Sequence, residues 1–116
     1  MKIESNVKCQ ENQSNKICLC PIEGIIDVIS KKWALLIVGI IGNHQKIRYK
    51  DIMKNLNKIN PKTLSDRLKE LENAGLIKRE AFAEIPPRVE YSLTKDGFEV
   101  RDAMIPLMEW ASKKNK

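Results

Sequence analysis

Hydrophobic residues in the first part of the chain recur at spacings that predict two helices. Between residues 21 and 30, four isoleucines lie one, three or four positions apart, and Pro21 suits a first helical position because its missing N–H is not needed there. The following segment, Trp33–Ile41, is apolar at nearly every position and is followed by Gly42-Asn43, a typical helix end. A helix that is apolar on nearly every side is predicted to be buried at the centre of the core.

Two amphipathic helices with a tight turn between them are predicted next. Tyr49–Leu56 carries its apolar residues on one side, and Lys58–Asn60 forms the turn. Asn60 is a favourable N-cap, and the proline after it fits the first helical position. The helix that follows should span residues 61–74, because three leucines form its buried stripe and Gly75 ends it.

Two strand-like segments follow, joined by a tip that contains two prolines. The first is Leu76–Phe82, and in the second, Arg88–Leu93, apolar and polar side chains alternate. Prolines cannot donate ladder hydrogen bonds, so residues 83–87 are predicted to be a hairpin tip. Thr94 then caps a last helix, which must kink or restart at Pro106.

A helix pair followed by a β-hairpin is the element order of a winged helix-turn-helix. We therefore predict a mainly α fold with a small β-wing of two or three strands. Residues 1–17 are polar and unpatterned and are expected to form a flexible arm. Residues 18–116 are expected to form one domain, which includes the C-terminal helix.

Composition adds a charge argument to this picture. The 116 residues carry a net charge of +6 and give a pI of about 9.3, so the chain favours a polyanionic partner such as nucleic acid. No apolar run in the sequence approaches the roughly 20 residues that span a bilayer, and the N-terminus lacks a hydrophobic signal core. We expect a cytoplasmic protein with no membrane partner, whose three cysteines are free thiols. Because only 5% of the residues are aromatic, no ligand pocket is expected within one chain, although one could form between two chains.

The helix expected at residues 61–74 is the candidate recognition helix for double-stranded DNA. With its leucines turned inward, its polar residues point outward, and the N-terminal residues of such a helix approach base edges while its flanks meet phosphates. The residues of this region expected to contact DNA are Asn60, Lys62, Thr63, Ser65, Asp66, Arg67 and Lys69. The base-edge candidates are Lys62, Thr63, Ser65 and Asp66, and the phosphate candidates are Arg67 and Lys69. Each could instead belong to a solvated polar face.

Three residues outside that helix are further candidates for contact with DNA. Arg88, beside the two prolines of the tip, would enter a minor groove or bind a phosphate. Its alternative role is that of an ordinary exposed strand arginine. Arg48 is a candidate for the DNA backbone, and Tyr49 could either reach a phosphate through its hydroxyl or pack at the start of its helix.

A set of short motifs spread over residues 18–111 gives a second, independent indication. They are Cys20-Pro21, Lys32-Trp33, Arg48-Tyr49, Asn60-Pro61-Lys62-Thr63-Leu64, Arg67-Leu68-Lys69-Glu70-Leu71-Glu72, Gly75-Leu76, Pro86-Pro87-Arg88-Val89-Glu90-Tyr91 and Leu93-Thr94. In combination they resemble the HxlR-type transcription regulators, which are winged helix-turn-helix proteins related to the MarR group. The resemblance implies a homodimer that binds an operator and regulates transcription.

The same resemblance implies a dimer interface built from the first and last helices. Those helices carry more apolar groups than one small core needs, which is typical of an interface, although all of them could pack within one subunit. The residues expected at this interface are Ile22, Ile25, Ile26, Ile29, Met104, Leu107, Met108 and Trp110. A dimer would repeat the recognition helix about one DNA turn away and would read a pseudo-palindromic site.

Some members of the family sense oxidants or electrophiles through a cysteine placed like Cys20, so the resemblance makes Cys20 a candidate sensor. A predicted helix N-terminus next to it would stabilise its thiolate. Cys18 could act as the resolving thiol or pair with Cys20 of another subunit. Alternatively, both are inert thiols.

Other functions have weaker support from the sequence. A metal site made of Cys9, Cys18, Cys20 and His44 would lack the two-pair spacing of structural zinc sites, so no metal or other cofactor is expected. His44 has no evident nucleophile or carboxylate arrangement around it, so an enzyme is not expected. A winged helix that binds RNA or another protein, without operator specificity, is the alternative function.

Overall fold

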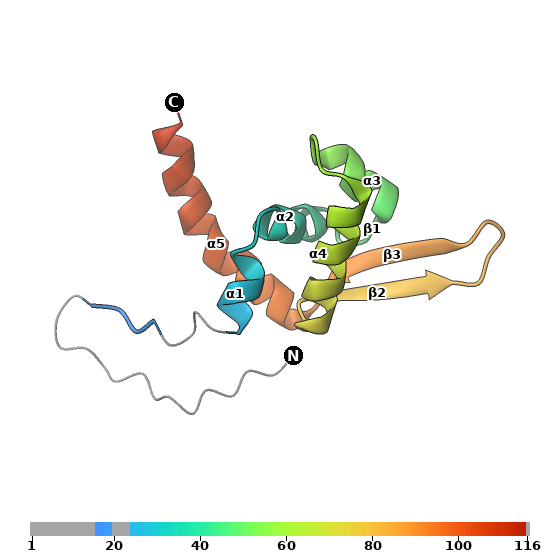
Figure 1. The fold of residues 1–116 in the computed structure, drawn as a ribbon, viewed down its shortest axis with the longest axis horizontal. Helices are drawn as coiled ribbons and strands as arrows, with labels where there is room; N and C mark the ends of the chain where they lie inside the picture. The colour runs from blue at the N-terminus through green and yellow to red at the C-terminus, as the bar shows by residue number, and fades with distance from the viewer. Residues whose placement is uncertain (1–15, 20–23, 116) are drawn as a thin grey trace.

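The computed structural model describes residues 16–19 and 24–115, which form five helices, a three-stranded sheet and their connections (Figure 1). In chain order the elements are α1 (Ile25–Ile29), α2 (Ala34–His44), β1 (Ile47–Arg48), α3 (Tyr49–Asn55), α4 (Pro61–Asn73), β2 (Ile77–Phe82), β3 (Arg88–Leu93) and α5 (Lys95–Lys114). The N-terminal arm predicted at residues 1–17 lies outside the described residues, apart from its last two positions. The start predicted for the first helix at Pro21 also lies outside them.

The sheet has the order β1-β3-β2 and is antiparallel throughout. β2 and β3 form the predicted hairpin, with Ile77 opposite Leu93 at its base and Phe82 opposite Arg88 next to the tip. β1 adds two residues to the other edge of β3, so the sheet has three strands, the larger of the two numbers predicted. The predicted alternation in β3 is confirmed near the base, where Tyr91 and Leu93 are buried.

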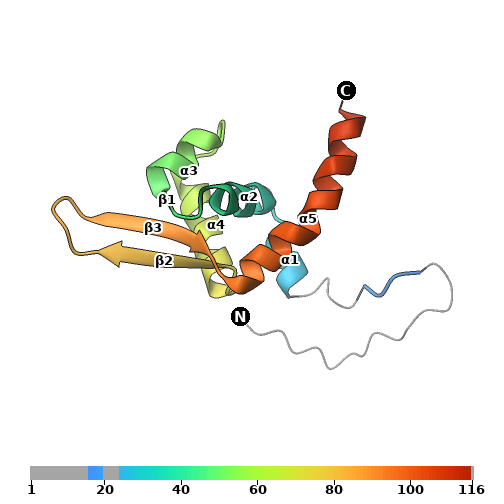
Figure 2. The same cartoon turned by 180° about the vertical axis from the view of Figure 1, so that it is seen from behind.

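The core is built around α2, as its apolar sequence predicted. Ala34, Ile37, Val38 and Ile41 have no exposed surface. In both views α2 lies between α5 on one side and α3 with α4 on the other, so its side chains meet neighbours in several directions (Figures 1 and 2). Burial is not complete around the helix: Leu35 and Ile40 are partly buried, and about half of Leu36 (52%) is exposed.

The predicted end of α2 at Gly42-Asn43 is wrong, since the helix continues to His44. Gly42 is in a helical conformation, and because it has no side chain, other side chains can pack closely against the helix at this position. A Cβ atom at this position would collide with the side chains of Arg101 and Leu93. The left-handed position that stops the helix is instead occupied by Gln45, with φ of 62°.

Both predicted N-caps are confirmed. Asn60 begins α4 by accepting a hydrogen bond from the backbone N–H of Thr63 at 2.8 Å, and Thr94 begins α5 by accepting one from Gly97 at 3.1 Å. The Thr94 hydroxyl also donates to the carbonyl of Gly75 at 2.6 Å, which fixes the start of α5 to the end of α4. Gly75 has φ of 79° and ends α4 as predicted.

The elements together form a winged helix, mainly α with a small β-wing. The β2–β3 wing and the C-terminal half of α5 extend in opposite directions from the central helices (Figures 1 and 2). α5 passes through Pro106 without the restart that the sequence left open, and it changes direction along its length (Figure 2). Within the described part of the chain, no helix is long and apolar enough to cross a membrane.

Candidate nucleic-acid interface

The first feature of the interface is the junction of α3 and α4, the two helices of the helix-turn-helix. The hydroxyl of Tyr49, at the start of α3, donates to the carbonyl of Pro61 at 3.0 Å and lies 3.3 Å from the hydroxyl of Ser65. These contacts hold the first turn of α4 against α3. Of the two roles considered for Tyr49, this geometry shows packing at the helix start, while its hydroxyl still lies at the surface.

The outward face of α4 is polar along its whole length. Leu64, Leu68 and Leu71 are at most 2% exposed and form the buried stripe, so the predicted orientation of this helix is confirmed. On the outer face, the ammonium of Lys62 lies 3.1 Å from a carboxylate oxygen of Asp66, one turn further along. The remaining predicted residues of the helix lie around this pair: Thr63 is half-buried, and Ser65 and Lys69 are exposed.

A cleft of about 330 Å³ separates α4 from the wing. It is lined by Tyr49, Ser65, Leu68, Lys69, Glu72, Arg79 and Tyr91. Neither Lys69 nor Arg79 makes an ion pair or side-chain hydrogen bond with another described residue, so the two cations outnumber the one carboxylate of the cleft. The cleft therefore combines an excess of positive charge with three hydroxyl-bearing side chains, those of Tyr49, Ser65 and Tyr91, a combination that suits a phosphate oxygen.

Arg67 differs from its neighbours on α4 because its guanidinium is bound within the protein. It donates to the carbonyl of Lys32, in the turn between α1 and α2, at 3.0 Å, and it lies 3.1 Å from a carboxylate oxygen of Glu70. Glu70 in turn pairs with Lys31 at 3.2 Å. Arg67 thus ties the recognition helix to the α1–α2 turn, and only 21% of its side chain is exposed.

Arg88 is also bound within the protein, on the wing. Its guanidinium stacks on the ring of Phe82, with 4.3 Å between the central carbon and the ring centroid. It pairs with Glu84 at 3.1 Å and lies 3.7 Å from Glu90. These contacts direct the arginine across the hairpin and leave Ile85, which is fully exposed, at the tip of the wing.

The other DNA candidates, Arg48 and Asn60, differ in how much of each side chain is already bonded within the protein. Arg48 is exposed, lies opposite Glu90 of β3 in the sheet, and makes no ion pair or side-chain hydrogen bond with another described residue. Asn60 uses its side-chain oxygen as the helix cap, so only its amide nitrogen remains for a partner. Sequence reasoning missed Arg79. The available signal was strand alternation, which places Arg79 on the same sheet face as Ile77 and therefore toward α4.

The residues predicted for the dimer interface fall into two groups. Ile25, Ile26, Ile29, Met104 and Leu107 line an apolar cleft of about 470 Å³ within this chain, so the expectation of no pocket in one chain is wrong. The walls of the cleft are α1 and the part of α5 from Asp96 to Leu107, with Leu35 and Leu76 between them. Met108 and Trp110 are exposed, and Ile22 lies outside the described residues.

The expectation that the cysteines are free thiols is wrong for Cys18, which is disulfide-bonded. Disulfides that do occur in a reducing compartment are usually transient and catalytic or redox-sensing rather than structural. Cys20 and Cys9 lie outside the described residues. His44 is the exposed last residue of α2, with a ring nitrogen 2.8 Å from the carbonyl of Ile40, and no group of metal-binding side chains occurs among the residues that the structure describes.

Comparisons with known proteins agree with this geometry. The family model described as HxlR-like helix-turn-helix matches residues 28–116. An HTH-type transcriptional regulator of Halalkalibacterium halodurans is 38% identical over 93 residues, which cover 80% of this chain and 82% of that protein. The crystal structure of a possible HxlR family transcriptional factor from Thermoplasma volcanium has a TM-score of 0.76 at 30% identity, covering 85% of this chain and 88% of that one.

A third similar structure is that of the redox regulator HypR in its oxidized form. It has a TM-score of 0.69 at 33% identity and covers 81% of this chain and 96% of that one. The family match extends over most of the chain, and the identities to relatives and solved structures exceed those expected of a shared fold alone. The chain belongs to the HxlR family of helix-turn-helix transcriptional regulators.

Proposed function

We propose that the protein binds double-stranded DNA in a sequence-specific manner and so regulates transcription in the cytoplasm. The observation that carries this proposal is the cleft between α4 and the wing, where neither Lys69 nor Arg79 has an acidic partner among the described residues. A winged helix places its second helix in the major groove, and this cleft then faces the backbone that borders the groove. A phosphate there would satisfy both cations.

The polar face of α4 supplies the contacts to the bases in this proposal. Lys62, Ser65 and Asp66 lie on its first two turns and are exposed. Because Lys62 and Asp66 already form a pair, they would present a donor and an acceptor side by side to a base pair. Arg67 and Arg88, whose guanidinium groups are bound within the protein, would orient the helix and the wing.

We propose further that the protein acts as a homodimer on a pseudo-palindromic operator. The support is the C-terminal half of α5, where Leu107, Met108 and Trp110 are 50%, 41% and 58% exposed. Apolar side chains gathered on one helix usually mark an interface, and a twofold axis there would present two recognition helices about 34 Å apart, one turn of DNA.

Thiol oxidation is the proposed signal for this regulator. Cys18 is already disulfide-bonded, and the oxidized form of HypR is among the similar structures. Cys20 would be the reactive thiol and Cys18 the resolving one. We expect a Cys20→Ser variant to bind DNA equally well with and without a mild thiol oxidant, whereas the wild type responds. A response that survives in Cys20→Ser would remove Cys20 from this role.

The test of DNA binding begins with selection of a preferred site from a random duplex library. Fluorescence anisotropy then compares the selected duplex with a scrambled duplex of the same composition across a salt series. We expect specific binding at least about 1,000-fold tighter than binding to the scrambled site, with an affinity that falls as salt rises. Equal, weak binding to both duplexes would contradict the proposal and favour a winged helix that serves RNA or protein.

A further inference from the structure

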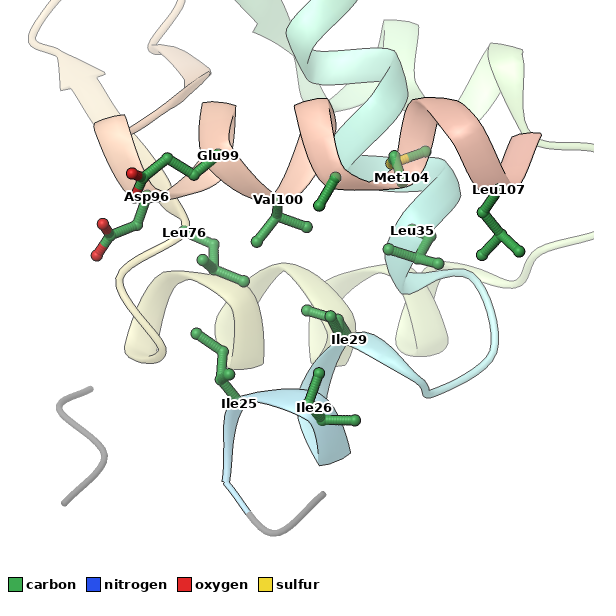
Figure 3. Close-up of a pocket in the computed structure, with 11 residues that line it drawn as sticks. Ile25, Ile26, Ile29, Leu35, Leu76, Asp96, Glu99, Val100, Met104 and Leu107 are labelled. Carbon is green, nitrogen blue, oxygen red and sulfur yellow. The ribbon is translucent and has the colours of Figure 1, made fainter. Parts of the chain in front are cut away.

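The cleft between α1 and α5 is a second hollow that DNA binding does not use (Figure 3). Its volume of about 470 Å³ falls in the range that holds small organic ligands. One wall is the three isoleucines of α1, the opposite wall is the face of α5 from Val100 to Leu107, and Leu76 lies between them. The walls are therefore almost entirely aliphatic.

Two carboxylates break this apolar lining, and both lie at the same end. Asp96 and Glu99 occupy neighbouring positions on one face of α5, and Figure 3 shows their carboxylate groups gathered beside the cleft. Among the residues that the structure describes, neither makes an ion pair or a side-chain hydrogen bond. They are the only charged side chains among the residues that line the cleft, so this end of it is negative.

We propose that this cleft binds an organic cation with an apolar body, such as a quaternary ammonium compound that carries an alkyl or aryl group. The apolar part would displace water from the isoleucine wall and the α5 wall. The cationic head would lie beside Asp96 and Glu99, which would repel an anionic ligand of the same shape. The apolar walls alone would accept any apolar compound, and the acidic pair alone would accept any cation. Together they favour a compound that has both an apolar body and a positive charge.

The position of the cleft gives the ligand a route to the recognition helix. α1 forms one wall, and the turn that follows α1 is bonded to α4 through the Lys31–Glu70 pair and the hydrogen bond from Arg67 to Lys32. Leu76 follows the end of α4 directly and leads into the wing. A ligand that moves α1 would therefore bias the position of α4, which makes the compound an effector of DNA binding. This last step rests on the proposed function, whereas binding to the cleft does not.

The experiment measures ligand binding to the full-length protein by isothermal titration calorimetry, without DNA. The probes are octyltrimethylammonium, 1-octanol and octanesulfonate, which share an alkyl chain and differ in head-group charge. We expect the cation to bind and the sulfonate not to bind. In the double variant Asp96→Asn/Glu99→Gln, affinity for the cation should fall about three- to tenfold while affinity for octanol stays unchanged, as expected when two exposed carboxylates are removed.

A matched control is the double variant Asp102→Asn/Glu109→Gln. It removes the same charge from α5 at exposed positions outside the cleft and should leave affinity for the cation unchanged. Ala103→Phe, which adds bulk inside the cleft, should abolish binding of both the cation and octanol. Equal loss of cation binding in both double variants would overturn the proposal, because it would reflect net charge.

A second copy of the chain is the competing occupant of the cleft. If no probe binds and Ala103→Phe also breaks the dimer in light scattering, the partner's helix fills the cleft and the proposal is overturned. Because ligand binding is measured without DNA, a failure of operator binding would leave this result unaffected. Where the operator is bound, adding octyltrimethylammonium to the wild type, but not to Ala103→Phe, should change its affinity.

Discussion

The candidate recognition helix α4 and the C-terminal helix α5 both begin with a side-chain cap, but their exposed surfaces differ: that of α4 is polar, whereas that of α5 is partly apolar. Each starts with a side-chain cap, from Asn60 and Thr94. α4 then buries all of its leucines and, after Pro61, exposes only polar residues. In α5 only Gly97 is buried, and several large apolar side chains are exposed. The helix with the polar surface suits a charged, hydrated partner, and the other suits an apolar one.

The comparison also shows where the stability of one subunit resides. The stripe of α4 is part of the continuous core around α2, so its loss should affect folding. The apolar surface of the second half of α5 lies outside that core and is exposed in one chain, and in the proposed dimer a partner would bury it. The same apolar character thus serves folding in α4 and, in the proposed dimer, would serve association in α5.

The largest expected effect is that of Leu68→Ala. This leucine is 2% exposed in the core, so we expect the free energy of unfolding to fall by about 2–5 kcal/mol in urea denaturation. The matched change, Leu107→Ala at a position that is 50% exposed, should cost less than about 1 kcal/mol in a monomeric background. Equal losses at the two positions would mean that α5 packs into the subunit core.

A charge on the apolar surface of α5 should break the dimer. We expect Met108→Glu to be monomeric in multi-angle light scattering and to bind a two-half-site duplex about 100-fold more weakly, because it loses the second half-site. Ser112→Glu adds the same charge to an exposed polar position of the same helix and should remain dimeric. A dimeric Met108→Glu protein would place the interface elsewhere.

The smallest effect concerns the cap of α4. Asn60→Ala removes the acceptor for the Thr63 N–H, so we expect a loss of about 1 kcal/mol in the free energy of unfolding. Asn57→Ala, at an exposed turn position just before, should change it by no more than about 0.5 kcal/mol. If both variants lose the same amount, the contact between Asn60 and Thr63 makes no net contribution.

Much of the fold could be predicted from local signals in the sequence. The caps, the leucine stripe of α4, Gly75 and the strand alternation each act over a few residues, and each was confirmed. The end of α2 was not predictable in this way, because Gly42 is set by contact with Arg101 and Leu93, which lie more than 50 positions away.

The roles of the arginines were also hard to predict, because they too depend on contacts with residues that are distant in the sequence. The sequence gives Arg67, Arg79 and Arg88 the same charge, but their partners come from elsewhere in the fold. Arg67 meets a backbone carbonyl 35 positions earlier, and Arg88 meets an aromatic ring across the hairpin. Arg79 forms no ion pair with any residue in the described part of the chain, and its place in the cleft is revealed only by the approach of α4 to the wing.

The central claim, that the cations of the cleft contact DNA phosphates while those bound within the protein do not, is tested by the salt dependence of operator binding. Anisotropy titrations at several salt concentrations give the slope of log K against log salt for the wild type and four single alanine variants. We expect Lys69→Ala and Arg79→Ala each to reduce the slope by about 1, and Arg67→Ala and Arg88→Ala to leave it unchanged. Reduced slopes for Arg67 and Arg88, with the wild-type slope for Lys69 and Arg79, would contradict the account.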